Sequence, residues 1–238
     1  MTERLQKGFT MRHRIIAALA GTALVCVAGL QAAPGIAASG KAPQPTLHNA
    51  EFSVGVDGKT TTRIDGKVAT AAPGKVLTNY YNGWRFQNKT ICQDNNIGAT
   101  WPIEAAGNAF ESGTVNPVLT YAGPGSNCPA SIPPYQVIHY SVYNANDNRC
   151  SKATGQWTGD APKIWATEVE IQMNNYYPSC KSSAQHLANH VSRITGQALG
   201  LAEFTETSGN PYIMNTGNAN IYSYAGSGDR TNLYWLYN

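Results

Sequence analysis

The chain has 238 residues, of which 42% are hydrophobic and 13% charged, and its formal net charge is +3. This length suits one or two domains. Four of the 17 basic residues and one of the 14 acidic residues precede position 39, which leaves 13 of each in the remainder. The basic balance therefore belongs to the N-terminus, and composition excludes nucleic-acid binding through a basic patch.

Residues 1–38 have the pattern of a secretory signal peptide. Four basic residues precede residue 15, residues 15–33 are almost wholly apolar, and small residues follow, with a cut site after Ala38. We therefore expect a secreted, extracellular protein. The alternative is an uncleaved membrane anchor, because about 19 apolar residues can span a bilayer.

Residues 39–75 are rich in Lys, Thr, Ala, Gly and Pro and carry few large apolar side chains. We expect a flexible N-terminal or pro-like segment. A small hairpin is indicated at Asp57-Gly58 or at Asp65-Gly66, since these pairs favour tight turns between strands.

The main domain is expected over residues 76–238. Alternation and β-branched or aromatic composition predict strands at 84–92, 118–121, 135–143 and 166–173, and apolar spacing predicts a helix at 100–110. The 166–173 segment places Glu168 and Glu170 on one face, which favours a half-exposed strand at a sheet edge. Residues 144–157 are interpreted as a polar loop.

The cysteines predict two disulfide bonds. Cys26 lies in the signal peptide, and the remaining four are Cys92, Cys128, Cys150 and Cys180. An even count in an exported chain favours disulfides, with three possible connectivities. We favour Cys92–Cys180 and Cys128–Cys150. No C-x-x-C spacing supports a zinc cluster.

The stretch from His186 to Glu203 predicts an amphipathic helix. Its apolar residues follow the 3, 4 and 7 spacing of one buried face: Leu187, Val191, Ile194, Ala198 and Leu201. Gly200 lies where the helix should end, because glycine readily adopts the reversing conformation. Met214 follows in a short apolar segment.

This stretch resembles the active-site helix of the metzincin zinc proteases, in particular secreted matrixin-like ones. Their pattern is H-E-x-x-H-x-x-G-x-x-H followed by a methionine turn. With the pattern glycine on Gly200, the scaffold letters agree at Gly196, Ala198, Leu199, Leu201 and Met214. The resemblance implies an α+β fold over roughly residues 80–238, with a mixed twisted sheet. It also implies the order strand, helix, strands, active-site-type helix, Met-turn and C-terminal helix, and residues 229–237 would be that closing helix.

The residues that carry the chemistry of that pattern are replaced. The three ligand positions hold Arg193, Gln197 and Glu203, and the general-base position holds Ile194. Arginine has no lone pair for a metal, and isoleucine cannot accept a proton from water. We therefore expect no catalytic residue and no metal cofactor at these positions. An ion pair between Arg193 and Glu203 is expected to fill the space of the metal.

The alternative reading keeps zinc, bound by displaced ligands. His186 and His190 stand four residues apart, so a helix places both on one face. His139 or Glu203 would complete such a site. The plain reading of the two histidines is a partly solvated polar helix face. Calcium binding is left undetermined, because the loop acids Asp147 and Asp160 lack the dense carboxylate spacing of calcium sites.

These observations favour a secreted, non-catalytic matrixin-like homologue whose groove holds an extended peptide or protein by strand addition. The second hypothesis is an active zinc-dependent endopeptidase that uses His186 and His190. The third is a purely structural exported domain.

Overall fold

The structure is a computed structural model, and it describes residues 44–68, 84–111, 117–159, 163–203, 213–215 and 224–238. The strands are β1 (His48–Gly55), β2 (Thr60–Ile64), β3 (Lys67–Val68), β4 (Trp84–Arg85), β5 (Thr90–Asn95), β6 (Val118–Ala122), β7 (Val137–Tyr143), β8 (Arg149–Thr158), β9 (Lys163–Trp165) and β10 (Val169–Asn174). The α-helices are α1 (Ile103–Glu111), α2 (Ala184–Ala198) and α3 (Ser227–Tyr237), and the short 3₁₀ turns include Pro178–Lys181. None of the helices among these residues is long and apolar enough to cross a membrane.

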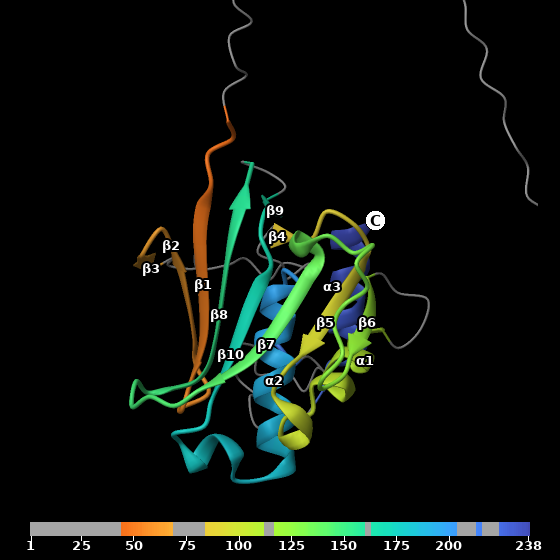
Figure 1. Ribbon diagram of the computed structural model, residues 1–238. Coiled ribbons are helices and arrows are strands. Elements are labelled where there is room, and N and C mark those ends of the chain that lie inside the picture. The colour runs from red at the N-terminus through yellow and green to blue at the C-terminus, as the bar shows by residue number, and fades with distance from the viewer. Residues whose placement is uncertain (1–43, 69–83, 112–116, 160–162, 204–212, 216–223) are drawn as a thin grey trace, which may run out of the picture. The chain divides into compact units, whose positions relative to one another are not determined.

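The strands form one mixed sheet, which establishes an α+β fold (Figure 1). Its order is β3-β2-β1-β8-β10-β7-β5-β6, with β9 paired to β4 and β8. β10, β7, β5 and β6 run parallel, whereas β8 is antiparallel to β1, β10 and β9. Helix α2 packs against β1, β8 and β10, and α1 packs against α2, β5 and β6.

The core lies between the sheet and the helices. Alternate residues of the central strands turn inward and are fully buried, among them Phe52, Ile138, Ile171 and Met173. Val191 and Ile194 supply the apolar face of α2, as the spacing of the sequence predicts.

Much of the N-terminal segment belongs to the same sheet. Both predicted turns are present: residues 56–59 join β1 to β2, and Asp65-Gly66 joins β2 to β3. Asp65 and Gly66 both have positive φ, 47° and 77°, as a two-residue hairpin turn requires. Residues 48–68, within the segment expected to be flexible, form strands β1 to β3, and β1 pairs with β8 along nearly its whole length.

Two interpretations of the domain are corrected by strand pairing. The expected polar loop at 144–157 contains β8, a ten-residue strand between β1 and β10. The strand expected at an edge is β10, and it is central, since β7 and β8 pair with its two sides. In addition, the segment expected as one strand at 84–92 is divided between β4 and β5.

The disulfide pairing favoured above is wrong. Cys92 pairs with Cys128, and Cys150 pairs with Cys180. Each bond joins two consecutive cysteines of the chain, and the sequence separations are 36 and 30 residues. Two disulfides fit an oxidising, extracytoplasmic environment. The predicted signal peptide, residues 1–38, lies outside the described residues.

Candidate functional site

Helix α2 is defined at both ends by local chemistry. The Ser183 side chain caps its start by accepting a hydrogen bond from the backbone N–H of His186, at 3.1 Å. At the other end the Gly200 N–H donates to the Gln197 carbonyl, and the Leu201 N–H donates to the Gly196 carbonyl. Gly200 has a φ of +103°, so the chain reverses where the sequence predicts.

Met214 packs against helix α2 at Gly196. A β-carbon at residue 196 would come within 2.8 Å of the Met214 sulfur, so the glycine permits this close approach. The turn is fixed by Asp229 at the start of α3, whose carboxylate accepts hydrogen bonds from the backbone N–H groups of Ile213 and Met214. The methionine turn, the helix and α3 therefore form one packed unit.

Arg193 and Glu203, the first and third ligand-equivalent positions, form the expected ion pair. The Arg193 side chain is completely buried, and only 12% of the Glu203 side chain is exposed. Burial raises the pKa of Glu203, and Arg193 opposes that rise. The positive charge beside Glu203 is therefore the Arg193 guanidinium, which has no lone pair to offer a metal.

The N-terminal hairpin closes over this ion pair. Arg193 Nη1 donates to the Gly58 carbonyl oxygen in the turn between β1 and β2. The Thr60 hydroxyl, at the start of β2, donates to the second carboxylate oxygen of Glu203. These partners were not predicted from sequence, because a turn carbonyl and a lone threonine carry no recognisable pattern.

The other two replaced positions are also buried. Ile194 is fully buried in the apolar core, where it offers no proton acceptor. Gln197 is 1% exposed, and its Oε1 has no hydrogen-bond partner among the described residues. Ile194 and Gln197 therefore cannot accept a proton from a metal-bound water, and the Glu203 carboxylate is engaged by Arg193 and Thr60.

His139 does not lie beside His186 and His190 as a third ligand. His186 is partly exposed, and its Nδ1 contacts the Ser182 hydroxyl. His139 extends from β7 on the sheet face opposite to that of the inward-turned Tyr140, and it pairs with Asp94 at 3.0 Å. Tyr140 instead contacts α2 through a 2.8 Å hydrogen bond to Thr195. His139 therefore lies across the sheet from the helix that carries His186 and His190.

One group of side chains in the described ranges brings three metal-ligating residues together: Cys150, Cys180 and His190. The two cysteines are joined as a disulfide, so their sulfur atoms are not available as thiolates in this state. Sequence spacing gave no signal for this group, because its members come from three separate elements.

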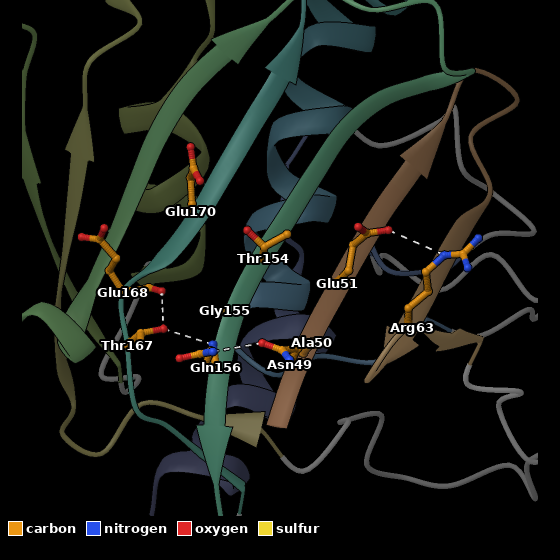
Figure 2. Close-up of a pocket in the computed structure, with 11 residues that line it drawn as sticks. Asn49, Ala50, Glu51, Arg63, Thr154, Gly155, Gln156, Thr167, Glu168 and Glu170 are labelled. Atoms are coloured by element: carbon orange, nitrogen blue, oxygen red, sulfur yellow. Dashed lines mark hydrogen bonds and ion pairs between the residues drawn. The ribbon is translucent and has the colours of Figure 1, made fainter. Parts of the chain in front are cut away.

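The outer face of the sheet carries a row of polar residues, one from each of six strands. Strand register places these residues opposite one another: Asp94, His139, Glu170, Thr154, Glu51 and Arg63. The part of the row from Glu170 to Arg63 lines an open hollow with a volume of about 480 Å³ (Figure 2). Glu168 and Gln156 also line it, so three carboxylates and one guanidinium face this space.

Searches for related proteins give no support to any assignment. No family model, no curated protein and no solved structure matches this chain.

Proposed function

We propose that this chain is a secreted, non-catalytic relative of the matrixin-like metallopeptidases, which binds a peptide or protein and does not cleave it. The observation that carries the proposal is the buried Arg193–Glu203 ion pair, formed by residues at two of the three ligand positions of the resembled motif. The two charged side chains occupy the volume that a metal and its ligands would need.

The order of elements supports the resemblance. Strand β5, helix α1, strands β6 to β10, helix α2, the turn at Met214 and helix α3 follow one another as the resemblance implies. The Met214 sulfur packs closely against Gly196, so the turn contacts the helix at one of the scaffold letters that agree with the pattern. A shared scaffold does not imply shared chemistry, and the site residues here favour binding over hydrolysis.

Strand addition at the expected strand is not available, since β10 is paired on both sides and β1 covers β8. The hollow on the outer face is a more accessible surface for a partner. Glu51 is already paired with Arg63 and Arg149, so Glu168 and Glu170 give the hollow an excess of negative charge. We infer that the partner is a basic, extended peptide segment, because charge complementarity selects partners of opposite sign.

The catalytic half of this proposal is tested by metal content and hydrolysis. The purified, oxidised protein is equilibrated with zinc, desalted and assayed against a broad peptide library. We expect no retained zinc and no cleavage. About one zinc per chain, together with cleavage that is lost in both His186→Ala and His190→Ala, would establish the displaced-ligand peptidase instead.

The binding half is tested with an array of extended peptides of varied charge. We expect Lys- and Arg-rich peptides to bind, and the Glu168→Lys/Glu170→Lys variant to bind them about tenfold more weakly or worse. Glu104→Lys is the matched control, because this exposed glutamate lies on α1, away from the hollow. Equal binding by both variants would rule out the hollow as the binding surface.

A further inference from the structure

The Cys150–Cys180 disulfide lies against helix α2. Cys150 is near the start of β8, and Cys180 is in the turn Pro178–Lys181 that precedes the helix. Both cysteines are fully buried. One ligand atom from each of Cys150, Cys180 and His190 falls within 4.8 Å of the other two.

His190 has a feature that the fold leaves unexplained. His190 is only 7% exposed, yet its Nδ1 has no hydrogen-bond partner among the described residues. Burial, reinforced by the positive charges of Arg193 and His186, lowers the pKa of His190 to about 4. At neutral pH the ring is therefore uncharged, which is the form in which histidine binds metals.

We propose that reduction of the Cys150–Cys180 disulfide creates a zinc site, in which the two cysteine thiolates and the His190 imidazole bind one zinc ion. Zinc prefers four tetrahedral ligands of this type, and water would take the fourth position. A newly made chain carries both cysteines as thiols, so the site exists before oxidation and is closed by it. This site goes beyond the proposed function, which concerns the oxidised protein.

The chemistry balances with a phosphine as the reductant. One phosphine and one water convert the disulfide into two thiols and a phosphine oxide, so two electrons move from phosphorus to sulfur. Zinc then binds as the two thiols lose their protons, and these two protons are released to solvent. Exchange with a small-molecule disulfide, which takes up the two electrons and two protons and becomes two thiols, re-forms the Cys150–Cys180 bond and removes two of the three protein ligands.

The test compares oxidised and phosphine-reduced protein after desalting, with cobalt as a spectroscopic probe and zinc as the measured metal. We expect the reduced chain to bind about one zinc and to show thiolate-to-cobalt charge-transfer absorption, whereas the oxidised chain shows neither. His190→Ala should weaken zinc binding of the reduced chain by at least about tenfold, since the loss of supporting groups around a metal already costs that much. His186→Ala is the matched control on the same helix, and it should bind as the wild type does.

A second variant separates the two disulfides. Cys150→Ser/Cys180→Ser keeps Cys92 and Cys128, so persistence of the cobalt absorption in this variant would overturn the proposal. If the reduced wild type loses its fold, zinc is expected to restore the circular dichroism spectrum of the oxidised protein and to raise the unfolding temperature. A reduced chain that neither binds zinc nor regains structure with it would equally refute the site.

Discussion

We expect the Arg193–Glu203 ion pair to stabilise the folded protein. A charge buried without a partner is strongly unfavourable, whereas a buried pair replaced by apolar residues of similar size costs little. Arg193→Met leaves Glu203 without its cation and should lower the free energy of unfolding by about 3–5 kcal/mol.

The double variant Arg193→Met/Glu203→Leu should recover most of that loss, because it removes both charges. Urea unfolding of the wild type, both single variants and the double variant completes the mutant cycle. A destabilisation of the double variant equal to the sum of the two single effects would mean that the two residues do not act as a pair.

His190 predicts a pH dependence of stability. Its pKa in the folded protein is lowered to about 4 from an ordinary value of 6.5. The stability gained from the neutral ring is present above pH 6.5 and is lost as the pH falls toward 4, because the unfolded chain binds the extra proton first. The size of this effect is about 3 kcal/mol.

The prediction is checked by comparing wild type with His190→Gln across pH 4 to 7. The difference in unfolding free energy between the two proteins should shift in favour of the wild type as the pH rises. Asp229 acts in the opposite direction, because burial raises its pKa to about 6, but it is present in both proteins and its contribution cancels. A difference that stays constant with pH would show that the His190 ring does not change its protonation on unfolding.

At the scale of elements, the end of α2 depends on one backbone conformation. A β-carbon at residue 200 would lie 2.0 Å from the Trp84 carbonyl oxygen, and the φ of +103° is itself unfavourable for other residues. Gly200→Ala should therefore destabilise the protein strongly by displacing β4 from the helix end.

Gly66→Ala provides the control for that change. Gly66 also has a positive φ, 77°, but a β-carbon there would meet nothing within 4 Å. It should cost about 1 kcal/mol from backbone strain alone, and Gly200→Ala should exceed it by about 2 kcal/mol or more because of the added clash. Equal unfolding temperatures for the two variants would contradict this account of the helix end.

Elements with local signals were predictable from the sequence, and elements defined by distant pairing were not. Helix α2 was predicted from its apolar spacing and Gly200, and the two hairpin turns from Asp-Gly pairs. Strand β8 was missed because its outward residues are polar and one of its partners, β1, lies far away in sequence. The polar outer face of β10 suggested an edge, although backbone pairing on both sides makes the strand central.

For the molecule as a whole, the contacts between the N-terminal hairpin and the Arg193–Glu203 ion pair could not be predicted from the sequence. The spacing of the resembled motif brought Arg193 and Glu203 together correctly. The contributions of Gly58 and Thr60 depend on β1 pairing with β8, which no local pattern indicates. The Cys150, Cys180 and His190 group depends likewise on a disulfide pairing that the cysteine count left open.

We propose that the chain departs from the metallopeptidase-like pattern only at the residues that carry its chemistry, and restoring these residues tests this proposal most directly. Zinc content is measured for the oxidised wild type and for Arg193→His/Gln197→His/Glu203→His, with folding of each confirmed by circular dichroism. We predict no zinc in the wild type, about one zinc per chain in the triple variant, and peptide hydrolysis only after Ile194→Glu is added to supply the base. A folded triple variant that binds no zinc would contradict the matrixin-like geometry, and zinc in the wild type would contradict its loss of the metal.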